Sequence, residues 1–128
     1  MSGYLTDTHI IYWFRLGWHH RLTAPVVQLM EDIQNDVYYS VVNPWELSIK
    51  CMKGKLSLPD DFLTTLPNLG FDCMPIEEKH VETLRTLPRI HDDLFDRMLV
   101  AQAISENMTL ITADKHLLQY PVKLLTVD

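Results

Sequence analysis

The chain contains 128 residues with a formal net charge of −6, and 47% of its residues are hydrophobic and 22% charged. This length and composition predict one globular domain over residues 1–128 and exclude collagen-like, low-complexity and wholly disordered chains. No apolar run is long enough to span a membrane and no secretory signal is recognisable, so we expect a cytoplasmic protein with no membrane partner.

The first half of the chain alternates between short strands and amphipathic helices, as the spacing of its apolar residues indicates. Thr23 and Asn43 precede two of the helices and are predicted to cap them, and Ile33 is expected on a buried helix face. The predicted elements are a strand that ends at Asp7, helices over 10–16, 24–33 and 44–52, and a strand over 38–42.

The second half continues this alternation. The apolar block 95–104 is too long for a typical strand and predicts a buried helix, and Val81 is expected on the buried face of another. The remaining elements are helices over 60–69, 77–87 and 115–118 and strands over 71–74, 108–112 and 122–127. The order predicts an α/β fold, a parallel sheet covered by helices on both faces, which binds ligands beyond the carboxyl ends of its strands.

Five acidic residues fall at or just beyond those carboxyl ends. Glu46 and Asp96 are predicted in first turns of helices, where the helix dipole favours negative charge, and Asp93 shares a helix face with Asp96. Singly, each is explained as a helix cap or a solvated first-turn residue. Together they repel strongly unless some are protonated or a cation lies between them. The five are Asp7, Glu46, Asp93, Asp96 and Asp114.

An all-oxygen ligand set favours Mg²⁺ or Mn²⁺ over zinc, and such ions take their remaining ligands from water and substrate phosphate. Cys51 and Cys73 match no metal-binding spacing and are predicted to be cytosolic thiols. The negative charge argues against a nucleic-acid partner. Assigning the five acids to a metal site, however, changes the charge of the remaining residues from −6 to −1.

Two basic clusters could flank a nucleic acid strand: Lys50 with Lys53 and Lys55, and the run from His19 to Arg21. Lys50 is explained equally well by an i,i+4 pair with Glu46, and the other lysines by a solvated face.

Four blocks of sequence, in this order, resemble the PIN-domain ribonuclease toxins of the VapC type. The resemblance implies a three-layer α/β/α domain with a central parallel sheet of four to five strands. It further implies an acidic pocket that binds Mg²⁺ or Mn²⁺ and hydrolyses RNA phosphodiesters, a cognate antitoxin that inhibits it, and a homodimer. The blocks are Leu5 to His9, Asn43 to Leu56, His91 to Ala103 and Leu110 to Asp114.

Residue by residue, the family's four acids match Asp7, Glu46, Asp96 and Asp114, with Asp93 as an extra acid. The resemblance makes these four the candidate catalytic residues and all five the candidate metal ligands. Leu94 stands where this subgroup commonly has proline, which leaves the start of that helix less defined. Candidates for contacting substrate or a metal-bound water are Thr112, Lys50 and Arg97.

Several histidine and tryptophan residues are compatible with either a structural or a functional role. His9 is expected to pack behind the first helix, and His91 is a candidate for touching substrate. Trp45 is expected to be buried at the start of its helix, with stacking on a base as the alternative. Trp13 and Trp18 are either core or a surface for a partner helix.

Two other functions stay open beside the ribonuclease. The first is a non-catalytic acidic module whose pocket receives a partner's basic side chain. The second is a hydrolase or receiver-like domain that acts on small phosphates, which the lack of an acidic residue adjacent to Asp7 disfavours.

Overall fold

The structure is a computed structural model that describes residues 3–90 and 92–127, so His91 lies outside the described residues. The elements are β1 (Tyr4–Thr6), α1 (Thr8–Arg15), η1 (His19–Arg21), α2 (Ala24–Glu31), β2 (Val37–Ser40), α3 (Val42–Met52), α4 (Phe62–Thr65), η2 (Pro67–Leu69), β3 (Asp72–Met74), α5 (Glu78–Thr86), α6 (Leu94–Ser105), β4 (Thr109–Thr112), η3 (Lys115–Gln119) and β5 (Lys123–Thr126). No helix in these described ranges combines the length and apolar character needed to cross a membrane.

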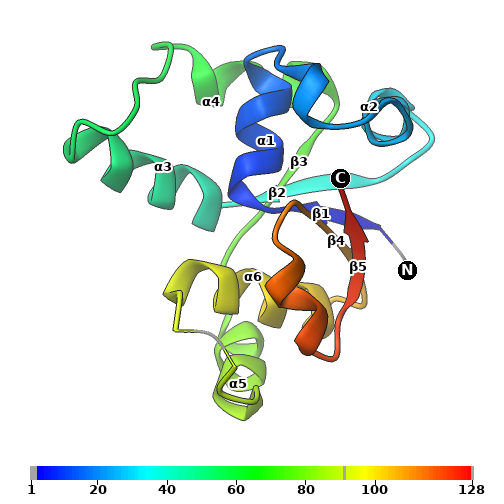
Figure 1. The fold of residues 1–128 in the computed structure, drawn as a ribbon, viewed down its shortest axis with the longest axis vertical. Helices are drawn as coiled ribbons and strands as arrows, with labels where there is room; N and C mark the ends of the chain where they lie inside the picture. The colour runs from blue at the N-terminus through cyan, green and yellow to red at the C-terminus, as the bar shows by residue number, and fades with distance from the viewer. Residues whose placement is uncertain (1–2, 91, 128) are drawn as a thin grey trace.

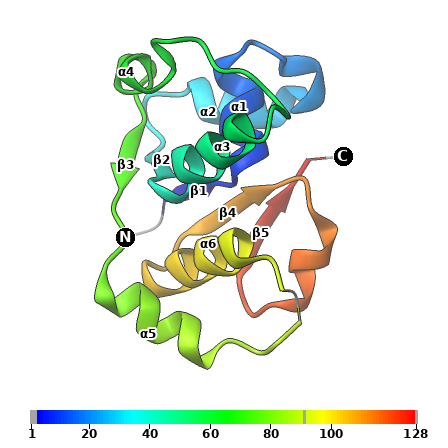
Figure 2. The same cartoon turned by 90° about the vertical axis from the view of Figure 1, so that its left-hand side faces the viewer.

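All five strands run parallel in the order β3-β2-β1-β4-β5. Helices α1 to α4 lie on one side of this sheet and α5 and α6 on the other (Figures 1 and 2). The predicted three-layer α/β/α architecture with a parallel sheet is therefore confirmed.

Successive side chains along each strand point to opposite faces of the sheet, and each face therefore has its own hydrophobic core. In β4, Leu110 packs with α6 and Leu5 in one cluster, whereas its neighbour Ile111 packs with α1 and α2 in the other. Both residues are fully buried, which explains why these strands are continuous apolar runs in the sequence.

Two predicted helix starts differ from the structure. Thr23 precedes α2 but its side chain makes no capping bond, and Asn43 lies inside α3 instead of capping it. The Asn43 side chain accepts from the Ser40 N–H at 2.9 Å and donates to Thr8 Oγ1 at 3.0 Å. Asn43 thus joins β2 to α1, a tertiary role that outweighs its local capping preference. Because α3 begins earlier than predicted, Glu46 lies in its second turn.

Two predicted buried faces are also wrong at one residue each. Ile33 lies beyond the end of α2 and is 90% exposed, and Val81 is half exposed while His80 beside it is fully buried. The helix predicted over 60–69 is divided at Pro67, which cannot continue the hydrogen bonding of α4.

Candidate active site

Two of the acids follow the adjacent strands β1 and β4. Asp7 caps α1 by accepting the Ile10 N–H at 3.1 Å, and Asp114 caps η3 by accepting the His116 N–H at 2.9 Å. The chain winds from β1 outward to β3 and then returns to β4 on the opposite side. Asp7 and Asp114 therefore lie at the point where strand order reverses, which is where open α/β sheets bind ligands.

Thr112 connects these two acids. Its fully buried hydroxyl donates to Asp7 Oδ2 and accepts the Asp114 N–H at 3.0 Å. The Thr112 hydroxyl thus orients the carboxylate of Asp7 and the backbone of Asp114, and its contact with a metal-bound water stays a prediction.

The next two acids come from the start of α6. Asp93 Oδ1 accepts the N–H groups of Phe95 and Asp96 at 2.9 and 3.0 Å, and Asp96 lies in the first turn as predicted. These two bonds define the start of α6 although Leu94 replaces proline there, because the carboxylate satisfies two N–H groups of the first turn.

Glu46 projects from α3 and is only 8% exposed. Its Oε2 lies 3.6 Å from Lys50 Nζ, which confirms the predicted i,i+4 pair. Its Oε1 is buried and, among the described residues, has no hydrogen-bond partner. An orphaned carboxylate oxygen is costly to bury, and its cost falls when a cation or a donor occupies the adjacent space.

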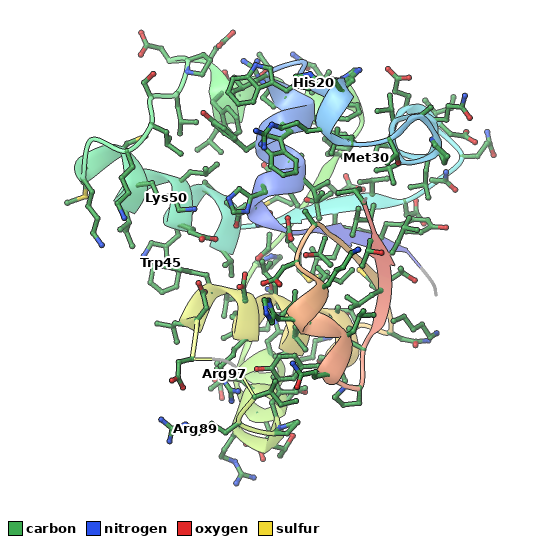
Figure 3. All side chains as sticks on the ribbon, in the orientation of Figure 1. His20, Met30, Trp45, Lys50, Arg89 and Arg97 are labelled. Carbon is green, nitrogen blue, oxygen red and sulfur yellow. The ribbon has the colours of Figure 1, made fainter. Side chains whose placement is uncertain are left out.

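All five carboxylates line one cavity of about 460 Å³, which we call the acidic cavity. His9, Trp13, Lys50 and Ala113 complete its lining. Figure 3 shows Lys50 and Trp45 along α3. A larger cavity of about 590 Å³ beside α1 and α4 shares no lining residue with it, and Arg15 and Asp61 there pair at 2.9 Å.

Burial raises the pKa of two of these carboxylates, those of Asp96 and Asp7. Burial, followed by the charges of Asp93, Asp7, Glu46 and Asp114, raises the pKa of Asp96 to about 7. Burial also raises the pKa of Asp7, although the bond from Thr112 and the Ile10 N–H act in the opposite direction. The acidic cavity therefore favours either protons or a bound cation at neutral pH.

The donor set fits a hard divalent cation. The lining offers carboxylate oxygens as ligands, and one of them, Glu46 Oε1, is buried without a hydrogen-bond partner among the described residues. Lys50 also belongs to the lining, where no other lysine or arginine of the described residues is found. Mg²⁺ is ordinarily held by one or two carboxylates plus water and phosphate, so it does not require the oxygens to converge on one point before it binds.

Outside the acidic cavity, one ligand atom from each of Glu77, His80 and Glu106 lies within 4.8 Å of the others, and among the described residues this is the group with ligand-type atoms that close together. His80 Nδ1 accepts the Glu77 N–H at 3.0 Å, so the neutral ring carries its proton on Nε2, 2.7 Å from Glu106 Oε2. A nitrogen that donates a proton has no lone pair for a metal. This cluster joins α5 to α6 and does not supply a site.

Arg97 was predicted to contact substrate, but its side chain points away from the acidic cavity. Its guanidinium donates to the Pro88 carbonyl at 3.0 Å and to Tyr120 Oη at 3.3 Å, and it does not line the acidic cavity. Figure 3 shows it near α5, away from Lys50.

The sequence analysis did not predict that His9 and Trp13 line the acidic cavity. His9 is exposed and lines the cavity instead of packing behind α1, and Trp13 lies one turn further along the same helix. The i,i+4 spacing of His9 and Trp13 was the available signal, because it places both on one face of α1, the helix that begins directly after Asp7.

The sequence model of the PIN domain family matches residues 4–123 of the chain. A search of curated protein sequences gave no significant match. Among solved structures, the chain is similar in fold to one chain of VapBC2 from Rickettsia felis, described as bound to a DNA fragment from their promoter. That similarity has a TM-score of 0.73 and 18% identity and covers 100% of both chains.

A toxin-antitoxin complex from Klebsiella pneumoniae matches with a TM-score of 0.66, 18% identity and 97% coverage of both chains. VapBC-5 from Mycobacterium tuberculosis matches with a TM-score of 0.56 and 17% identity, covering 98% of this chain and 97% of the other. At these identities the likeness establishes the fold, and the sequence match to residues 4–123 establishes the family: the chain belongs to the PIN domain family.

Proposed function

We propose that residues 1–128 form a toxin that hydrolyses RNA phosphodiester bonds with the help of Mg²⁺ or Mn²⁺. The single observation that carries the proposal is the convergence of five carboxylates from β1, α3, α6 and β4 on one cavity at the switch point of the sheet. Membership of the PIN domain family and the toxin-antitoxin complexes with the same fold support it.

In this proposal Asp7, Glu46, Asp96 and Asp114 hold the metal, and Asp93 contributes charge while fixing the start of α6. The bound ion supplies a positive charge that makes a water molecule more acidic and stabilises the charge that develops on the phosphate oxygens. The raised pKa of Asp96 means that this residue releases a proton when the cation binds near neutral pH.

Two further side chains, Thr112 and Lys50, support the reaction. Thr112 keeps the Asp7 carboxylate in one orientation, which is the outer-sphere role that metal ligands ordinarily require. Lys50 pairs with Glu46 at 3.6 Å, and with a cation held by Glu46 its ammonium would be available to contact a substrate phosphate. A lysine suits that contact because its ammonium is a point charge on a flexible stem.

We further propose that a cognate antitoxin inhibits the enzyme in the cytoplasm by placing a basic side chain against the acidic cavity, and that the toxin is a homodimer. The charge of the cavity supports the first point because an arginine forms strong paired bonds with carboxylates. The toxin-antitoxin complexes that share this fold support the antitoxin partner, and the homodimer is proposed from the family resemblance alone.

The direct test is cleavage of RNA by the purified chain, free of antitoxin. We expect cleavage with Mg²⁺ or Mn²⁺ that stops when EDTA is added, and we expect Asp7→Asn to abolish it while the circular dichroism spectrum is kept. Wild-type rates in Asp7→Asn, or equal rates with and without EDTA, would exclude the mechanism. Binding of a partner without any cleavage would instead favour a non-catalytic module.

A further inference from the structure

The wall of the acidic cavity formed by α1 is aromatic. The rings of His9 and Trp13 both line the cavity, and their centroids lie 5.4 Å apart at an interplanar angle of 36°. His9 is exposed and Trp13 is half-buried, so part of the surface of each ring faces the open space next to the carboxylates. We call this pair the aromatic wall.

A cation lies over the Trp13 ring. The guanidinium carbon of Arg21, on η1, is 5.1 Å from the centroid of that ring, and Arg21 is exposed and is not part of the cavity lining. Because an exposed arginine can exchange an aromatic ring for a phosphate, the Trp13 ring can offer this face to a base while the guanidinium contacts the neighbouring phosphate.

This arrangement is not accounted for by packing alone. Trp13 contacts the core beneath α1, yet it remains half-buried and open to the cavity, whereas Phe14, the next residue, is almost completely buried. Trp18, in the same part of the chain, packs edge-on against Tyr12 and is 42% exposed but does not line the cavity. Of these two tryptophans, Trp13 is thus the one that lines the cavity with the carboxylates.

A strand of RNA that places one phosphate among the acids must find its favourable contacts around them. The cavity itself repels phosphate, because its lining carries five carboxylates and, besides His9, one basic residue, Lys50. A nucleobase stacked on an aromatic ring contributes binding that does not depend on charge and that only an unpaired base can make.

We propose that Trp13 is a substrate-binding residue on which an unpaired base beside the cleaved bond stacks, with His9 extending the surface and Arg21 contacting the neighbouring phosphate. The inference rests on the proposed ribonuclease function and assigns to α1 a substrate-binding role beyond that of the four proposed catalytic acids.

The first test compares Trp13→Leu with Trp18→Leu as a matched control in steady-state cleavage of a short single-stranded oligoribonucleotide. We expect Trp13→Leu to raise KM by roughly 5- to 150-fold with little change in kcat, because the lost stacking is binding energy shared by substrate and transition state. Trp13→Phe should recover most of the KM. Trp18→Leu should leave both constants within about twofold of the wild-type values.

A merely structural role for Trp13 predicts a different pattern. The melting temperature and kcat would then fall together in Trp13→Leu, and KM would stay near its wild-type value. That pattern, in an active wild-type enzyme, would overturn the inference and leave the proposed ribonuclease function intact.

The second test measures binding without cleavage. In an Asp96→Asn protein in which Trp18 and Trp45 are changed to Phe, Trp13 is the only tryptophan and its fluorescence reports on the aromatic wall. We expect quenching by the single-stranded oligoribonucleotide and much less by a duplex of the same sequence, since paired bases cannot stack on a protein ring. Equal quenching by both would refute the inference.

The two proposals can fail separately. If the wild-type protein cleaves no RNA with Mg²⁺ while single strands still quench Trp13, the ribonuclease function fails and the binding role of the aromatic wall stands. In the same assay, Arg21→Gln should weaken binding and reduce its dependence on salt, because one phosphate contact is lost. An unchanged salt dependence would remove Arg21 from the assignment.

Discussion

Asp96→Asn should make the metal-free protein more stable at neutral and higher pH while it abolishes cleavage. In the folded chain Asp96 is partly buried among four other carboxylates, and its pKa rises from 3.8 to about 7. Asparagine has nearly the same shape but no charge to bury. The substitution therefore removes repulsion together with a proposed metal ligand.

The sign of the effect follows from linkage. Because the folded pKa lies above the unfolded one, the folded state binds more protons between about pH 4 and pH 7, and its stability falls as the pH rises through this window. A shift from 3.8 to about 7 corresponds to at most about 4 kcal/mol. Solvent reaches part of the side chain and screens the repulsion, so we expect a gain of about 1–3 kcal/mol at about pH 8. Near pH 4 the gain should vanish.

The assay is urea unfolding in EDTA at both pH values, with Asp92→Asn as the control. Asp92 lies just before α6, is 87% exposed at its side chain and pairs only loosely with Arg89 at 3.6 Å, so its substitution should change stability by less than about 0.5 kcal/mol. Adding Mg²⁺ at about pH 8 should stabilise the wild type more than Asp96→Asn. A stability change in Asp96→Asn that is the same at both pH values would refute the electrostatic reasoning.

Three other substitutions test the parts around the acids. Thr112→Val removes the hydroxyl that orients Asp7 and should lower activity or metal affinity by about 10- to 100-fold, measured as the Mg²⁺ dependence of cleavage. His80→Leu leaves the Glu106 carboxylate without its ring donor and should cost about 2–4 kcal/mol in urea unfolding; stabilisation of the wild type alone by Zn²⁺ would show instead that this cluster binds metal. Arg97→Gln should cost about 1 kcal/mol and leave kcat/KM unchanged, whereas a large fall in kcat/KM would return this arginine to the substrate site.

The positions of the acidic residues at the edge of the sheet could be predicted from the sequence, because they depend on helix capping, an interaction between residues close in the chain. Asp7 and Asp114 stand just beyond apolar strands, and Asp93 precedes a long apolar block, so each is recognisable as a cap at a carboxyl edge. Parallel strands share that edge, which brings the acids together without knowledge of the strand order. The same local rules fail for Asn43, whose side chain is used by two other segments of the chain.

What the sequence by itself determined is the alternation of strands and helices, the buried helix α6 and the line of acids at one edge of a parallel sheet. These features follow from apolar spacing and from capping, which act over a few residues. Only the tertiary structure decided that Arg97 turns toward Pro88 and Tyr120 and that His9 and Trp13 line the acidic cavity. It also decided that one oxygen of Glu46 has no hydrogen-bond partner within the part of the chain that the structure describes. The direction of a side chain depends on which helices pack beside it, and that packing is set by crossover connections between residues distant in sequence.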